Sequence, residues 1–161
     1  MKKLLCEFKS PLRILVLLFS TNFIFAQDTL LLAPGKDYQE IQLSCVKRET
    51  FVIKSQGALD SLIHEDPRLT TCINYSPPYF DFSNEVILGI NLEKGGCSQP
   101  SIIEKGVIKN VKEKKYTFYL TYHKYGLCKA LHFISYYIKI SHYDPAYSIE
   151  IKTLEDKNFK D

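Results

Sequence analysis

The chain has 161 residues and a formal net charge of +3 at pH 7. The first 26 residues hold four of the 21 Lys and Arg residues and one of the 18 Asp and Glu residues, which leaves 17 of each sign in the remainder. This balance argues against a nucleic-acid binder and against simple attraction to an anionic membrane.

The first 26 residues have the layout of a secretory signal peptide. A basic head precedes an apolar run at 14–19, and the segment ends in the small residue Ala26. The run is far shorter than the ~20 residues of a membrane-spanning helix, so we expect no stable membrane insertion. We expect cleavage between Ala26 and Gln27, which would leave residues 27–161 as a single exported domain in the periplasm or the medium.

The first part of this domain predicts two short strands and one helix. Residues 37–45 alternate, with Ile41, Leu43 and Cys45 on one face, and residues 50–54 are short and β-branched. The next segment, 56–63, follows Ser55, which is a favourable helix cap, and repeats its apolar residues at helical spacing. A connector with three prolines comes after it.

The second part predicts strands linked by short turns. We expect them over residues 86–92, 102–111, 114–124, 129–141 and 147–152. The strand at 102–111 is the weakest and is expected to break at Gly106, whereas 129–141 is apolar on both faces, as a central strand is. The pattern predicts a mostly β fold, an antiparallel β-sandwich or open barrel with one short helix and two disulfides.

The cysteines after the leader are even in number, as in a disulfide-bonded exported protein. They are Cys45, Cys72, Cys97 and Cys128. Gly95 and Gly96 are expected to turn the chain after one strand and Gly126 after another, which places a cysteine at each of two sheet ends. Three connectivities are open; we favour 45–72 with 97–128, because each pair encloses a local unit.

The segment FDFSNEVILGINLEKGGCS, at residues 80–98, resembles the domain of the protease complex subunit PrcB family. Together with the later GLCK at 126–129, it is also similar to small exported bacterial proteins of unknown function. The resemblance covers roughly the last half of the chain. It implies an accessory subunit of an exported protease, without a catalytic role of its own.

The sequence carries no local motif for catalysis or for a cofactor. Its histidines, His64, His123, His132 and His142, lack the tight spacing of a metal motif. No nucleophile elbow or phosphate loop occurs. We therefore expect no catalytic residue, metal or cofactor. A Ser/His/Asp site assembled in space remains open, since such triads do not depend on chain order.

The best candidate for a binding surface is one face of the strand at 114–124. Thr117, Tyr119 and Thr121 alternate there with apolar residues of the opposite face. Tyrosine is amphipathic and suits interfaces. The sequence thus predicts an exported, non-enzymatic binding or accessory module whose partner is an exported protease or another envelope protein. The alternatives are a small exported hydrolase and a structural envelope component.

Overall fold

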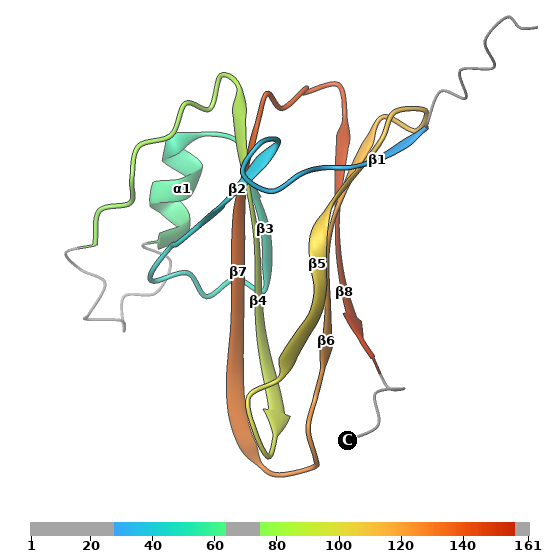
Figure 1. Cartoon of the computed structure of the whole chain (residues 1–161). Helices are drawn as coiled ribbons and strands as arrows, with labels where there is room; N and C mark the ends of the chain where they lie inside the picture. Colours follow the sequence, from blue (N-terminus) through green and yellow to red (C-terminus); the bar gives the residue numbers. More distant parts are fainter. Residues whose placement is uncertain (1–27, 64–74, 157–161) are drawn as a thin grey trace, which may run out of the picture.

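The computed structural model describes residues 28–63 and 75–156 and contains two four-stranded sheets. Its elements are β1 (Thr29–Leu31), β2 (Tyr38–Ile41), β3 (Thr50–Ile53), α1 (Gln56–Ile63), β4 (Glu85–Gly96), β5 (Ser101–Asn110), β6 (Lys115–His123), β7 (Ala130–Ser141) and β8 (Ser148–Glu155). Sheet A has the order β1-β5-β6-β8, and sheet B has the order β2-β7-β4-β3. The sheets face each other, and α1 lies on the outer side of sheet B (Figure 1). The predicted mostly β, sandwich-like fold is confirmed.

The core between the sheets follows from alternation on the long strands. On β4, Val86, Leu88 and Ile90 point toward sheet A and are fully buried. On β6, Phe118 and Leu120 point back toward sheet B. A side chain of this size stabilises the fold by about 1.5–3 kcal/mol when it is fully buried. The apolar side chains thus repeat every two residues along these strands. This repeat sets both the register of the strands and the side of each strand that faces the core.

A second cluster covers the outer face of sheet B. Ser55 Oγ accepts a hydrogen bond from Ala58 N at 3.2 Å and so caps α1, as expected. The helix buries Leu59, Leu62 and Ile63 in a cluster that includes Tyr137 of β7. Strand β7 thus packs on both faces between β2 and β4, and its predicted central position is confirmed.

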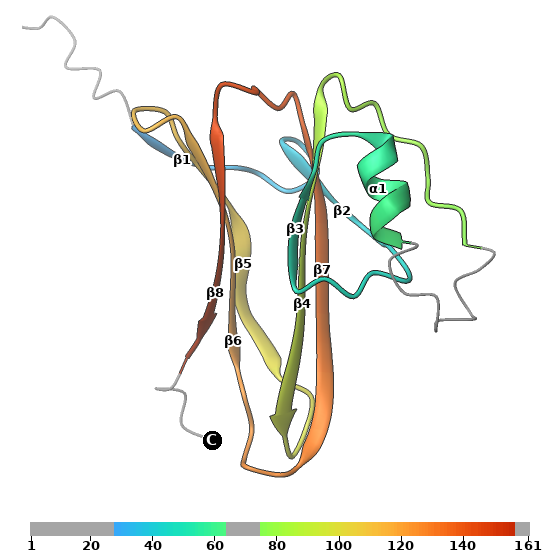
Figure 2. The ribbon, with the colours of Figure 1, turned by 180° about the vertical axis from the view of Figure 1, so that it is seen from behind.

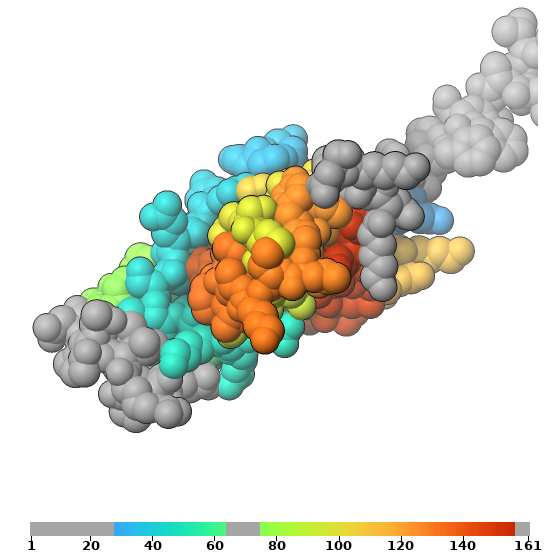
Figure 3. Space-filling view, turned by 90° about the horizontal axis from the view of Figure 1, so that it is seen from below, coloured from blue at the N-terminus to red at the C-terminus, as the bar shows by residue number. Residues whose placement is uncertain are grey.

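The chain leaves sheet B after β4 and returns to it at β7. Both of these connections lie at the same end of the sandwich, which we call the crossover end. Residues 97–100 lead from β4 to β5, and residues 124–129 lead from β6 back to β7. A disulfide joins Cys97 to Cys128 and ties the two connections together, as predicted. Figure 3 looks onto this end, where the two connections lie side by side.

Other parts of the cysteine and leader predictions fall outside the described residues. Two disulfides were predicted, and the described residues contain both cysteines of one of them, Cys97–Cys128. Cys45 is also disulfide-bonded, but Cys72 lies outside the described residues, so the 45–72 pairing stays a prediction. The proposed signal peptide at 1–26 lies outside them as well.

Two expectations about the strands were wrong. Gly95 and Gly96 do not form a turn but lie within β4, opposite Leu131 and Ala130 of β7. Strand β5 continues through Gly106, and its irregularity falls between Ile102 and Glu104. The sheets are mostly antiparallel, as predicted, and the exception among the described strands is β8, which pairs with β6 in parallel. The β7–β8 connection crosses between the sheets instead of forming a hairpin, which allows this direction.

A polar cluster joins the two sheets at the edge formed by β2 and β5. Lys105 Nζ lies 2.8 Å from Glu40 Oε1 and 4.3 Å from the centre of the Tyr136 ring. The Tyr136 hydroxyl donates to the same Glu40 oxygen at 3.4 Å. Burial, with smaller contributions from Tyr38 and Glu40, raises the pKa of Tyr136 well above its ordinary value of 10.0.

Tyr136→Phe is expected to weaken the loss of stability at alkaline pH. In the folded state the phenol stays protonated, whereas in the unfolded chain it ionises near its ordinary pKa, so wild-type stability falls as the pH rises above about 10. Urea midpoints measured between about pH 9 and 11 should therefore fall less steeply in the variant. Tyr79→Phe, at a side chain that is 85% exposed, is the control and should keep the wild-type slope. Parallel slopes for wild type and Tyr136→Phe would contradict the assignment.

Candidate binding surfaces

The predicted residues Thr117, Tyr119 and Thr121 lie half-buried on the outer face of β6, opposite its core-facing side. The strand register sets Tyr119 between Gly106 of β5 and Lys152 of β8. The residues around Tyr119 on this side of sheet A form what we call the Tyr119 face. They are Leu31, Glu104, Gly106, Ile108, Lys115, Thr117, Tyr119, Thr121, Glu150, Lys152 and Leu154. No described element covers this face, whereas α1 covers part of the outer face of sheet B (Figures 1 and 2).

The Tyr119 side chain is held in place by its neighbours. Its hydroxyl donates a hydrogen bond to Glu104 Oε1 at 3.1 Å. Its ring passes over Gly106, where an added Cβ would lie 3.0 Å from the tyrosine oxygen. Burial, and then the hydrogen bond to Glu104, raises the pKa of Tyr119 above 10.0. The phenol is therefore neutral at physiological pH and presents a fixed ring edge at the centre of the sheet.

Apolar side chains flank the tyrosine toward both edges of sheet A. Leu31 of β1 is 69% exposed and Leu154 of β8 is 55% exposed. Ile108 lies opposite Leu31 and Thr117 in the register. Charges occur between them, with Lys115 and Lys152 both paired to Glu150, at 3.3 and 3.2 Å. The face thus combines apolar, aromatic and paired charged groups on one side of sheet A.

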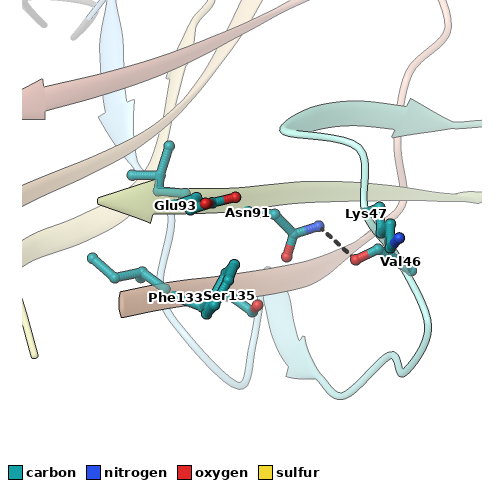
Figure 4. A pocket seen from close by; sticks show the side chains of 8 residues that line it. Val46, Lys47, Asn91, Glu93, Phe133 and Ser135 are labelled. Carbon is teal, nitrogen blue, oxygen red and sulfur yellow. Dashed lines mark hydrogen bonds between the residues drawn. The ribbon is translucent and has the colours of Figure 1, made fainter. Parts of the chain in front are cut away.

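A cavity of about 510 Å³ lies on the outer side of sheet B, beside the 45–49 loop. We call it the loop pocket. It is lined by Val46, Lys47, Asn91, Leu92, Glu93, Phe133, Ile134 and Ser135. Figure 4 shows its floor on β4 and β7 and its wall in the loop that leads from β2 to β3. Sequence reasoning did not identify this cavity, because its residues come from three separate segments.

Asn91 fixes the wall of the loop pocket to its floor. Its side-chain Nδ2 donates to Arg48 O at 2.9 Å and to Val46 O at 3.3 Å, while its Oδ1 accepts from the Tyr137 hydroxyl. Its backbone N–H donates to Glu49 O at 2.6 Å. The sequence held one sign that Asn91 has a special role, because it is the one polar residue within the apolar run VILGINL.

Three residue types of a hydrolytic triad do come together at the crossover end of sheet A. Ser101 lies directly opposite His123, and His123 Nδ1 lies 2.9 Å from the backbone oxygen of Asp156. However, Ser101 Oγ pairs with the Tyr125 hydroxyl at 2.9 Å. The histidine is therefore oriented by a main-chain oxygen, and the serine hydroxyl is oriented by a tyrosine. This is not the hydrogen-bond connectivity of a nucleophile and its base.

The remaining candidate residues do not form a metal site in the part of the chain that the structure describes. Within residues 28–63 and 75–156, no group of three His, Cys, Asp or Glu side chains could hold a metal ion. His132 Nε2 lies 3.3 Å from Gly96 O, and His64 lies outside the described residues. The same part of the chain contains no helix of the length and hydropathy needed to cross a membrane.

Comparison with known proteins finds no matching family model, no matching curated protein and no matching solved structure.

Proposed function

We propose that this chain is an exported, non-enzymatic binding or accessory module that contacts a protein partner through the Tyr119 face. The observation that carries the proposal is the difference between the two sheets. Sheet B packs a second apolar cluster against its outer side, whereas the described chain leaves the outer side of sheet A uncovered. An uncovered sheet face with several large apolar side chains is a feature of interaction surfaces.

The composition of the Tyr119 face supports a protein partner. Tyrosine is enriched among the residues that contribute most to protein–protein affinity, because it buries a large ring and keeps a polar end. Tyr119 loses little side-chain freedom on binding, since Glu104 and Gly106 already hold it. Leu31 and Leu154 add apolar area on either side.

Export and the class of partner rest on three further observations. The Cys97–Cys128 disulfide is typical of proteins that fold in an oxidising compartment. The basic and apolar leader of the sequence agrees with this location. The resemblance of residues 80–98 to PrcB-type domains makes an exported protease, or another envelope protein, the preferred partner.

Tyr119→Ala is expected to weaken capture of the partner by about thirtyfold, the effect of losing a hot spot worth ~2 kcal/mol. The measurement is a quantitative pull-down from the native envelope fraction. Thr117→Arg, on the same face, should weaken capture as well, because it places a long, charged side chain in the contact. Tyr79→Ala is the matched control, since Tyr79 is exposed but lies in the connector before β4.

Thermal melts of all three variants would separate lost contact from lost folding. Equal recovery of every captured protein by wild type, Tyr119→Ala and Thr117→Arg would refute the assigned surface. Hydrolytic activity in the purified protein that disappears in Ser101→Ala or His123→Gln would refute the non-enzymatic assignment and favour the hydrolase alternative.

A further inference from the structure

We infer that the loop pocket is a preformed binding site for a neutral saccharide of one or two sugar units. The site is separate from the Tyr119 face, because it lies on the outer side of sheet B and that face lies on the outer side of sheet A. The inference rests on how the wall is fixed, on the chemistry of the lining and on the size of the cavity.

The wall of the pocket is rigid without a ligand. One residue, Asn91, uses its side-chain amide and its backbone N–H to hold three carbonyl oxygens of the loop, those of Val46, Arg48 and Glu49. The loop is also anchored through Cys45, which is disulfide-bonded. An irregular loop held in this way has already lost its conformational freedom, so a ligand does not have to order it.

The lining suits a ligand that has both an apolar face and a polar rim. Phe133 is 64% exposed although it belongs to the central strand β7, and it lies opposite Glu93 in the β4–β7 register. The two side chains therefore offer an aromatic surface and a carboxylate next to each other. Ser135 adds a hydroxyl on the same strand (Figure 4). A sugar ring can lay its C–H face on an aromatic ring while its hydroxyl groups bond to carboxylate, hydroxyl and ammonium groups at the side.

The charges of the lining favour a neutral ligand over an ionic one. Lys47 and Glu93 carry opposite charges, and the other lining residues are uncharged. A strongly anionic or cationic ligand would meet one group of its own sign. A purely apolar ligand would cover the Glu93 carboxylate and the Ser135 hydroxyl without offering them hydrogen-bond partners, which is costly. The volume of about 510 Å³ falls within the range of ~300–1,000 Å³ typical of small-ligand sites.

The test is a titration of the folded, ¹⁵N-labelled protein with three neutral disaccharides: cellobiose, maltose and N,N′-diacetylchitobiose. At least one should give saturable amide shifts centred on residues 46–47, 91–93 and 133–135. Phe133→Ala and Glu93→Gln should each weaken that affinity tenfold or more, about 1.4 kcal/mol. Leu154→Ala, which removes an exposed apolar side chain from sheet A, should leave it unchanged, as should Tyr119→Ala.

Two results would overturn the inference. One is the absence of saturable shifts with all three sugars up to about 20 mM, a concentration at which even a millimolar site is mostly occupied. The other is binding that Phe133→Ala leaves intact. Glucosamine and glucuronic acid, added as charged probes, should bind more weakly than the neutral sugar; tighter binding of either would contradict the assignment to a neutral ligand. Because Tyr119→Ala is included, failure here is distinguishable from failure of the proposed protein-binding face.

Discussion

Gly89→Ala is expected to lower the free energy of unfolding by about 3 kcal/mol, at the upper end of what overpacking a core costs. Gly89 of β4 lies directly opposite Phe51 of β3, and the Phe51 ring occupies the space where a side chain would begin. A Cβ built on Gly89 would lie within 2.5 Å of three ring atoms. The ring cannot move aside freely, because Phe51 is buried and its centroid lies 5.8 Å from that of Tyr137.

The matched control is Gly57→Ala in α1, where an added Cβ meets nothing within 4 Å. That change should raise stability by up to about 1 kcal/mol, since alanine favours a helix more than glycine does. In a Phe51→Leu background, Gly89→Ala should cost less than in wild type, because the six-membered ring is gone. Urea denaturation of the four variants measures all three effects. A Gly89→Ala protein within about 0.5 kcal/mol of wild type would show that the second cluster repacks easily.

The sequence was sufficient to predict the elements whose pattern is local. The pattern correctly predicted strands over 86–92 and 116–122. Along 116–122 it also identified the core-facing side of β6, because a strand buried on one face must repeat every two residues. The apolar spacing after Ser55 correctly identified α1, because a cap and a helical stripe lie within three turns of chain.

Glycine positions were harder to interpret, since glycine serves several structural needs. We expected Gly95 and Gly96 to turn the chain and Gly106 to break a strand, yet all three lie within strands. Gly106 is required because the ring of Tyr119, on the neighbouring strand, occupies the space that a side chain at position 106 would fill. Only Gly126, with φ +64°, has the conformation of a turn glycine among these four. A close approach between strands depends on their register, which a single-sequence pattern does not contain.

The candidate sites depend even more on tertiary arrangement. The alternation of Thr117, Tyr119 and Thr121 predicted a face opposite the core, but not which sheet α1 would cover. The loop pocket unites residues from 46–47, 91–93 and 133–135, and its wall exists only because Asn91 reaches the loop. The polar residue within an apolar strand was visible, whereas its partners, more than 40 positions away, were not.

Replacing both Cys97 and Cys128 by alanine is expected to lower the free energy of unfolding by about 3–4 kcal/mol. The bond spans a sequence separation of 31, and releasing a loop of that size increases the entropy of the unfolded chain by roughly this amount. The effect should be large here because the bond joins both connections between the sheets at the crossover end. The measurement is urea denaturation without reductant, so that the disulfide at Cys45 stays intact.

Gly126 provides an internal check on this prediction, because it depends on the same bond. With φ at +64°, Gly126→Ala should cost about 1 kcal/mol from backbone strain alone. In wild type it should cost more, since the new Cβ would overlap Cys97 Sγ. Without the two sulfur atoms only the strain remains, so Gly126→Ala should be less destabilising in the Cys97→Ala/Cys128→Ala background than in wild type. Equal costs in the two backgrounds would mean that the glycine is required by backbone conformation only, and not by the closeness of the disulfide.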